Sequence, residues 1–316
     1  MAARNAKARE EARAGLLFLS PTLVIVLVLV VIPVLWTLML AFQRMRLIGL
    51  RRSGLLGQYT LANFETVLTA PGFWRALVIT LIFTTAGTAL SIVLGLAAAL
   101  LVRAQFRGRT LVRGAMLLPW VAPVVAMTFT WQVLLDPQLG FMNALGKDWF
   151  GWDQPIAFLA EERGELSIFG WKLGIPTALL TVILFEGWRY FPFAFLFLLA
   201  RLQAVPGELE EAARVDGATP LQRFRYVVLP QLAATIALLS VLRFIMTFNK
   251  FDDVYLLTGG AAGTDVVSVR VYNLLTARDD IGGAAAQAMV LAVVLVVLLA
   301  IYFRYFARRV EGAGGR

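Results

Sequence analysis

The residues able to do chemistry in this chain are few, because its 316 residues include no histidine and no cysteine. Such a chain has no Ser-His triad, no thiolate nucleophile, no disulfide and no His- or Cys-ligated zinc. The candidates are therefore charged side chains within apolar sequence. They gather in two stretches, one from Glu186 to Tyr190 and one from Arg243 to Asp253.

Glu186 and Arg189 are three residues apart, a spacing that lets two side chains meet on one helix face. Both residues lie in apolar sequence. If that sequence crosses a membrane, a charge near the bilayer centre costs about 2.5 to 3.5 kcal/mol on the insertion scale, so both side chains should face protein or water. Two interpretations stay open, a structural ion pair and a polar translocation path, and we favour the path. If Glu186 lines a path, replacing it with Ala should alter transport through that path. If Glu186 is only a structural ion-pair partner, the replacement should impair assembly alone.

Adjacent carboxylates at Asp252 and Asp253 are the other candidate, because paired acids can hold a metal in a membrane transferase. In an extended loop the two side chains would point to opposite sides, which weakens that reading. The nearest approach to a phosphate loop, Gly146-Lys147, continues with Asp148 instead of Ser or Thr. We therefore expect no catalytic residue, no metal site and no bound cofactor.

Apolar windows that could position these residues take up most of the chain. Hydrophobic residues make up 59% of it and the mean hydropathy is +0.76, well above soluble proteins. Six windows reach the roughly 20 apolar residues that a membrane span needs. They are Leu16 to Phe42, Trp74 to Val102, Leu111 to Leu135, Ile175 to Leu202, Gln231 to Leu257, and Gly283 to Tyr305.

Basic residues beside the windows set the expected orientation. With a cytoplasmic N-terminus, the inside segments hold 16 Lys and Arg and the outside segments 11, which favours both termini inside. The net charge of +9 then belongs to cytoplasmic loops and not to a nucleic-acid site. The cluster from Arg44 to Arg52 opposes this bias, and contact with a partner is the only account we have for it.

Two windows carry further signals. In the third, Pro119 and Pro123 each remove a backbone donor, which favours a kink or unwound turn beside a watery pathway. In the second, small residues recur every four positions, so they either permit close helix packing or reflect chance in an Ala/Gly-rich segment. These small residues are Gly87, Ser91, Gly95 and Ala99.

The loop between the fourth and fifth windows predicts a helix, a glycine turn and a second helix. Pro206 can open the first helix and Gly217 can end it in a left-handed cap. Thr219 can cap the second helix, and Pro230 should break the chain before the fifth span. One face of the first helix forms a shallow ridge that suits either a partner's groove or an interfacial connector. The ridge comprises Leu209, Ala212, Ala213 and Asp216.

This loop resembles the EAA loop of permease subunits of binding-protein-dependent ABC importers, closest to the maltose and glycerol-phosphate type. Residue types and spacing both match, with Val227 where the family usually has Ile. LLPWVAP at Leu117 to Pro123 and LLTGG at Leu256 to Gly260 extend the resemblance over nearly the whole chain. The matching loop residues are Glu211, Ala212, Ala213, Asp216, Gly217, Leu229 and Pro230.

The resemblance implies that this loop is a coupling helix seated in a cleft of a cytoplasmic ATPase subunit, with Glu211 and Gly217 at its centre. ATP and Mg would be used by the ATPase and not by this chain. The implied partners are a second homologous permease, two ATP-binding cassette subunits, an extracytoplasmic solute-binding protein, a sugar and membrane lipid. The binding protein would dock on short outer loops such as Asp136 to Lys172.

Sugar-lining positions of the maltose-type relatives also carry over by the resemblance. Several differ in type from the maltose pattern, which disfavours maltose itself but leaves an oligosaccharide or polyol; a glycerol-3-phosphate or other sugar-phosphate importer is the alternative. The matching positions are Trp120, Glu186, Tyr190, Arg243, Thr247 and Lys250.

The expected protein is all-α, a polytopic membrane protein of six helices with the type I ABC importer permease fold. Residues 1–14 form a cytoplasmic tail, 15–310 the transmembrane permease domain with the coupling loop at 203–230, and 311–316 a second tail. We expect it in a bacterial plasma (inner) membrane. A membrane transferase should work without an ATPase chain, and an ion channel should assemble symmetrically and would have no use for the EAA loop.

Overall fold

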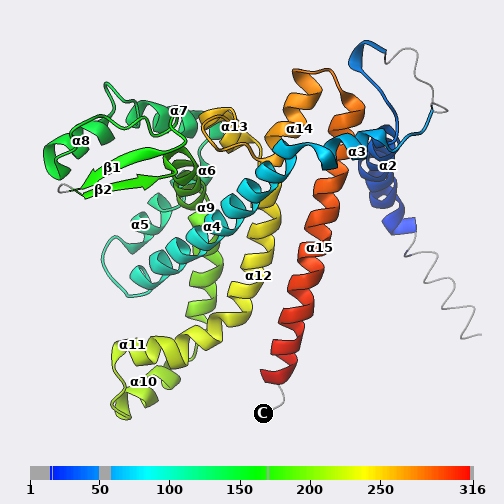
Figure 1. The fold of residues 1–316 in the computed structure, drawn as a ribbon. Coiled ribbons are helices and arrows are strands. Elements are labelled where there is room, and N and C mark those ends of the chain that lie inside the picture. Colours follow the sequence, from blue (N-terminus) through cyan, green and yellow to red (C-terminus); the bar gives the residue numbers. More distant parts are fainter. Residues whose placement is uncertain (1–14, 16, 50–57, 169–170, 314–316) are drawn as a thin grey trace, which may run out of the picture. The chain divides into compact units, whose positions relative to one another are not determined.

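The computed structural model describes residues 15, 17–49, 58–168 and 171–313, and they are mainly helical (Figure 1). The predicted tail 1–14 lies outside this range, as do Arg51 and Arg52 of the basic cluster. Two compact units are present. The first combines residues 1–70 with 271–294, and the second combines 71–270 with 295–316. The last helix, α15 (Ile281–Ala313), contributes to both and continues past the predicted boundary at residue 310.

Among the described residues, five helices are long and apolar enough to cross a membrane, and a sharply bent pair makes a sixth span if counted as one. The six predicted windows all find a counterpart. The fifth window, predicted at Gln231 to Leu257, is shifted along the chain. Its helix starts at Pro220 and ends at Phe248. The straight spans are Leu17–Ala41, Pro71–Leu101, Thr177–Gln203, Pro220–Phe248 and Ile281–Arg304, and the bent pair is Arg109–Val121 with Val124–Leu134.

The first unit joins the N-terminal span to the start of α15. Its span contains α2 (Ile32–Ala41), and short helices follow at η2 (Leu47–Gly49) and α3 (Ala62–Thr69). Buried Asn63 donates to the carbonyls of Ala41 and Gln43, at 2.9 and 2.8 Å. A backbone bridge from Arg46 to Asp280 then ties the loop to the base of α15. These bonds satisfy backbone groups that the end of the span leaves open.

The second unit is built on the pairing of α4 (Pro71–Leu101) with α9 (Thr177–Gln203). The small-residue stripe of α4 faces α9. A Cβ on Gly95 would lie 2.7 Å from Ala194 Cβ and 2.8 Å from Phe195 N, and Ser91 and Ala99 are fully buried. This approach is closer than any larger side chain permits, so the stripe is a packing surface and not a chance of composition.

Proline residues shape two other helices without ending them. The π-helical segments η1 (Leu27–Val31) and η3 (Phe224–Val228) each end two residues before a proline, Pro33 and Pro230. A proline ring clashes with the carbonyl four residues back, and a π-turn relieves that clash. The predicted break at Pro230 is therefore wrong: α11 (Pro220–Arg223), η3 and α12 (Leu229–Phe248) form one continuous helix.

The third span is broken as its prolines predict. It consists of α5 (Arg109–Ala115), α6 (Leu118–Val121) and α7 (Val124–Leu134), and the chain bends by 94° at the break before α7. Ala122, the residue before Pro123, is extended, as proline requires of its neighbour. A chain that turns this sharply between apolar helices must find partners for its freed carbonyls inside the protein.

The loop 136–175 is a small folded element. The Asp136 carboxylate accepts hydrogen bonds from the N–H groups of Leu139 and Gln138, and these bonds lower the pKa of its carboxyl below the usual value. Helix α8 (Phe141–Phe150) follows, and then an antiparallel hairpin of β1 (Gly164–Ile168) and β2 (Trp171–Ile175). The sequence did not predict this hairpin, although the fold remains a helical one. Helices α13 (Asp252–Thr258) and α14 (Val267–Thr276) complete the order.

Candidate functional site

The loop after α9 forms the helix and glycine turn that the sequence predicts. Helix α10 (Gly207–Val215) has Pro206 as its N-cap, and Gly217 has a φ of +78°. Ala218 N–H donates to Ala213 C=O at 2.9 Å and Gly217 N–H to Arg214 C=O at 3.1 Å. These two bonds are the Schellman pattern, which requires a residue with positive φ. Thr219 then begins α11 in a reciprocal capping box with Gln222.

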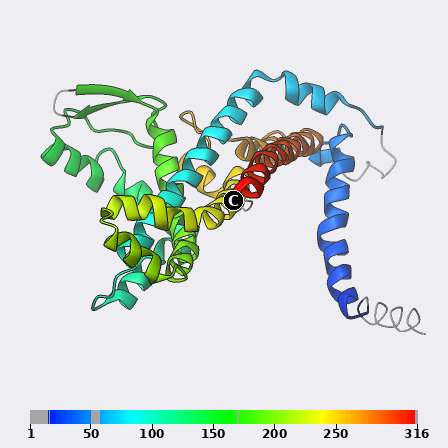
Figure 2. The same ribbon diagram turned by 90° about the horizontal axis from the view of Figure 1, so that it is seen from below.

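Most of α10 is exposed in the part of the chain that the structure describes. Glu211, Ala212 and Asp216 are exposed, and Leu209 is 43% exposed. Within the second unit, α10 and α11 lie at one end and α7, α8 and α13 at the other (Figure 1); seen from below, the yellow-green α10 and α11 face the viewer (Figure 2). Leu229 and Pro230 are the first residues of α12. The resemblance therefore assigns the coupling role to a ridge that is accessible to another protein.

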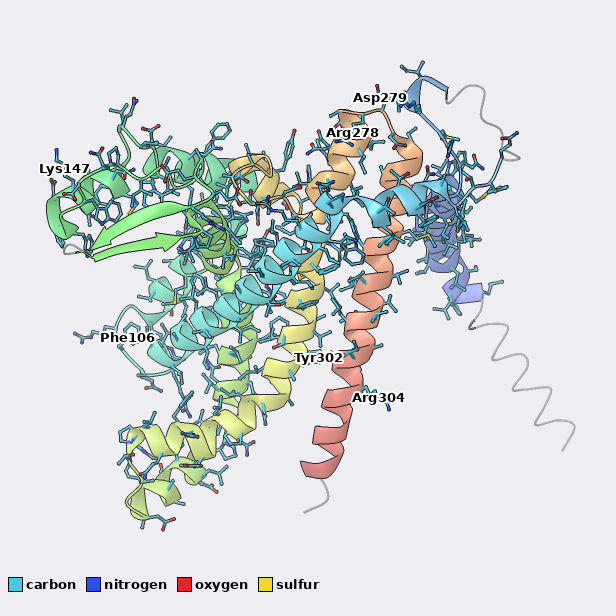
Figure 3. The ribbon with its side chains drawn as sticks, viewed as in Figure 1. Phe106, Lys147, Arg278, Asp279, Tyr302 and Arg304 are labelled. Atoms are coloured by element: carbon cyan, nitrogen blue, oxygen red, sulfur yellow. The ribbon has the colours of Figure 1, made fainter. Side chains whose placement is uncertain are left out.

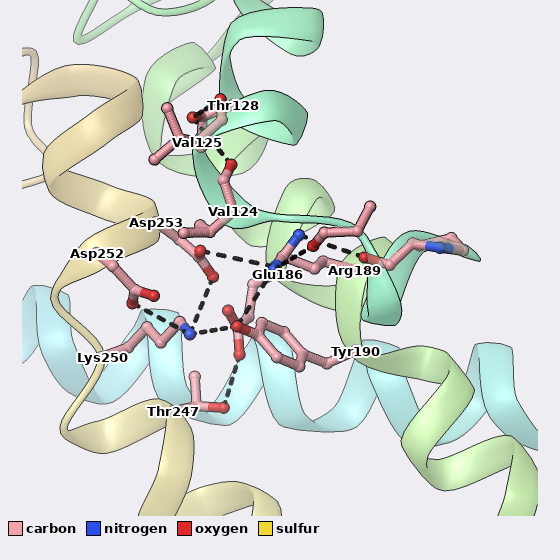
Figure 4. Close-up of polar contacts among 12 residues, drawn as sticks. Val124, Val125, Thr128, Glu186, Arg189, Tyr190, Thr247, Lys250, Asp252 and Asp253 are labelled. Atoms are coloured by element: carbon pink, nitrogen blue, oxygen red, sulfur yellow. Dashed lines mark hydrogen bonds and ion pairs between the residues drawn. The ribbon is translucent and has the colours of Figure 1, made fainter. Parts of the chain in front are cut away.

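Most of the expected path residues meet in one buried polar cluster (Figure 4). Glu186 of α9 receives Arg243 of α12 in an ion pair of 2.5 Å, with both side chains at most 1% exposed. The Thr247 hydroxyl donates to the same Glu186 oxygen at 2.9 Å. Arg243 Nε lies 3.4 Å from the Ser91 hydroxyl of α4. Glu186 therefore pairs with Arg243 and not with Arg189. The Arg243 side chain, from α12, comes closer to the Glu186 carboxylate than the side chain one turn further along α9 does.

Lys250 extends the cluster toward α13. Its ammonium group contacts the Tyr190 hydroxyl and lies 3.1 Å from Asp252 Oδ1 and 3.4 Å from Asp253 Oδ2. The expectation that Asp252 and Asp253 point apart is wrong, because they form the first turn of a helix and not an extended loop. Among the described residues no group of three or more acidic side chains could hold a metal ion.

Arg189 donates hydrogen bonds to the backbone at the break in the third span. Pro123 has no N–H, so the carbonyls at the end of α6 lack helical donors. The guanidinium of Arg189 provides the missing donors: it donates to Pro119 O at 3.3 Å and to Ala122 O at 3.1 Å. Its Nε also lies 3.9 Å from Asp253 Oδ1. Arg189 thus joins α6, α9 and α13, a role that the sequence did not reveal because its acceptors are backbone atoms about 70 residues away.

Exposure separates the six expected path positions. Trp120 on α6 is 39% exposed, and the Lys250 side chain is 15% exposed. Tyr190 is 8% exposed, with Arg243 and Lys250 over its ring at 4.4 Å each. The other three, Glu186, Arg243 and Thr247, are at most 1% exposed. A solute can touch only accessible atoms, so these last three side chains are out of its reach in this conformation.

The formal charges of the cluster balance, with three cationic and three anionic side chains. Arg189, Arg243 and Lys250 face the carboxylates Glu186, Asp252 and Asp253, and ion pairing offsets part of the cost of removing them from water. The sequence analysis considered Asp253 only as half of a possible metal-binding pair and did not place it in this cluster, where it is fully buried between Lys250 and Arg189. The three-residue spacing of Lys250 and Asp253 was the available signal.

A family comparison decides what kind of protein carries this loop and this cluster. Residues 91–312 match the family model described as "Binding-protein-dependent transport system inner membrane component". The chain belongs to this family. It is thus a multi-pass inner-membrane permease component of a transport system, and not an enzyme.

Relatives agree over almost the full chain. It is 34% identical over 285 residues to the inner membrane ABC transporter permease protein YcjO of Escherichia coli, covering 90% of this chain and 91% of that protein. It is 32% identical over 288 residues to the trehalose/maltose transport system permease protein MalF of Thermococcus litoralis, with the same coverage.

A solved structure shares the fold. One chain of a bacterial ABC transporter involved in the import of the acidic polysaccharide alginate matches with a TM-score of 0.77 and 24% identity, covering 97% of this chain and 99% of that one. The helical importer-permease fold expected from the sequence is thereby confirmed.

Proposed function

We propose that this permease imports a sugar or related polyol, delivered by an extracytoplasmic binding protein and driven by a separate ATPase. Two relatives whose names include trehalose, from Thermococcus litoralis and Mycobacterium tuberculosis, support the substrate class. The aromatic and hydrogen-bonding side chains around Tyr190 suit a polyhydroxylated solute. A sugar phosphate is the alternative, since Lys250 carries a positive charge at the accessible edge of the cluster.

The observation that carries this proposal is the exposed α10 with its positive-φ turn. Three ridge residues, Leu209, Ala212 and Asp216, are exposed in the described part of the chain, as is Glu211 on another face of the same helix. In the proposed complex that ridge sits in a cleft of the cytoplasmic ATPase, and closure of the ATPase pair tilts the spans. ATP and Mg belong to that subunit, and two ATPase chains and a second, homologous permease complete the assembly.

Within the path, we assign different tasks to residues of different exposure. Trp120 and Lys250 contact the solute, and Tyr190 does so once the helices part. Glu186, Arg243 and Thr247 hold these side chains in place from behind. The outer element 136–175 receives the binding protein, since it lies at the end of the second unit opposite α10 (Figure 1).

Two measurements test the proposed function. The chain expressed with its neighbouring subunits should co-purify with an ATPase chain, and proteoliposomes should take up labelled trehalose, maltose or glycerol 3-phosphate only with ATP. Purification without an ATPase, or uptake of all three without ATP, would contradict it.

Gly217→Val should leave ATP hydrolysis in place but reduce uptake at least tenfold. A Cβ at Gly217 meets nothing within 4 Å, so the change acts through its φ of +78°, which costs a non-glycine residue about 1 to 2 kcal/mol. Gly207→Val is the matched control at the other end of α10, where space is also open and φ is not positive. Equal uptake by both variants would argue against the coupling role.

A further inference from the structure

The coupling ridge is only one face of α10, and a neighbouring face is tied to the transmembrane part. Arg103, just beyond the end of α4, places its Nη2 2.5 Å from Glu210 Oε1. The side chains are 29% and 24% exposed, so this pair is more enclosed than a pair on an open surface. Glu211, the next residue, is exposed. Of these two adjacent glutamates, Glu210 is therefore paired within the chain and Glu211 is open to solvent.

The end of α4 next to this pair is firmly packed. Val102 is 2% exposed and lies in one apolar core with Leu202 of α9 and Leu232 of α12. In contrast, α10 buries none of its own residues. A push on α10 can therefore reach the spans through its chain ends, through its contact with η3, or through the Arg103–Glu210 ion pair.

Helix α4 leads from this pair to the polar cluster. Ser91, twelve residues before Arg103, lies about 18 Å away along a helix and contacts Arg243. One turn further, a Cβ on Gly87 would lie 2.9 Å from Glu186 Cγ. A displacement of α4 along its axis would therefore move the atoms against which Glu186 and Arg243 are packed.

We propose that Arg103 and Glu210 form a tether that carries the movement of α10 directly into α4, beside the covalent route through α9. Both are positioning residues: neither touches solute nor nucleotide. This inference rests on the proposed function, because it needs α10 to be the element that the ATPase moves. It assigns Glu210 to the permease interior and leaves Glu211 for the ATPase.

The test uses the full complex with its ATPase and second permease in liposomes. A Trp120→Cys reporter is the only cysteine in this chain, and its labelling by a membrane-impermeant maleimide is measured with and without ATP. Arg103→Gln and Glu210→Gln should each reduce the ATP-induced change in labelling per ATP hydrolysed by about two- to fivefold, the size expected for a partly enclosed ion pair. The exchange Arg103→Glu with Glu210→Arg should restore most of it.

Exposed neighbours of the same charge are the matched controls. Arg107→Gln in the same loop and Glu208→Gln on the same helix should leave the ratio unchanged. The tether is refuted if the two single variants behave like these controls, or if the exchange is as defective as either single change. If the exchanged pair fails to assemble, Arg103→Lys decides: a tether predicts that it couples better than Arg103→Gln.

Failure of the tether and failure of the proposed function give different results. If Gly217→Val abolishes the ATP-induced change while the Arg103 and Glu210 variants keep it, α10 couples but the tether is wrong. If Gly217→Val also keeps it, the coupling role of α10 itself is wrong.

Discussion

At the scale of single residues, the central feature is a buried ion pair between two spans. Glu186 and Arg243 are at most 1% exposed and bind each other at 2.5 Å. Glu186 Oε2 accepts no hydrogen bond from the described residues, so the carboxylate depends on Arg243 and Thr247. This geometry favours the structural interpretation of Glu186 over direct contact with a solute, because an enclosed carboxylate cannot meet one without helix movement.

Breaking this pair should therefore affect assembly before it affects solute preference. Arg243→Gln should lower the free energy of unfolding by about 3 to 5 kcal/mol, since it leaves Glu186 buried without its charge partner. Adding Glu186→Gln should recover most of the loss. Thermal unfolding of the purified complex measures both effects.

Arg75→Gln is the matched control for that experiment. Its partner is Glu162, and both side chains are more than half exposed, so we expect a change within about 1 kcal/mol. An Arg243→Gln variant as stable as this control, with altered solute preference, would instead support a direct role in the path.

At the scale of elements, the α4–α9 contact and the broken third span hold the cluster in place. Small residues of α4 let α9 approach until Gly87 lies against Glu186 and Gly95 against Phe195. Arg189 stabilises the break by donating to the carbonyls of α6. Helix propensity has little part in either feature, because both depend on contacts between segments far apart in the chain.

Gly95→Ala tests the helix contact. Its new Cβ would meet backbone and Ala194 at under 3.0 Å, so α4 and α9 must move apart, at a cost of about 1 to 3 kcal/mol. Gly114→Ala in α5 is the control, because nothing lies within 4 Å of that position. It should be neutral or stabilising by up to about 1 kcal/mol. Equal unfolding temperatures for the two variants would show that the stripe does not limit packing.

At the scale of the whole molecule, the spans differ in how much of each is buried. The most apolar window of Leu17–Ala41 has no buried residues, whereas 67% of the corresponding window of Thr177–Gln203 is buried. An all-apolar helix that the described residues of its own compact unit leave exposed is suited to lipid or to a neighbouring subunit. The polar cluster involves the most buried span, where charged groups find partners.

Topology is testable because the chain has no cysteine of its own. Phe106 projects from the turn after α4 and Lys147 from α8 (Figure 3), and both are exposed. With cytoplasmic termini, an impermeant maleimide should label Lys147→Cys in intact cells and Phe106→Cys only after permeabilisation. The reverse order would mean that the charge bias misassigns the orientation, and the unmodified chain controls for background.

Local signals in the sequence determined the spans, the kinked third window, the small-residue stripe and the glycine turn of α10. Hydrophobic length, missing proline donors and positive φ all act within a few residues, so they can be recognised without knowing the fold. The tertiary structure alone decided which charges pair. Glu186 binds Arg243 across helices, Glu210 binds Arg103, and Asp253 adjoins Arg189, because partners in a low-dielectric interior are chosen by proximity in space. Sequence spacing records only neighbours on the same helix.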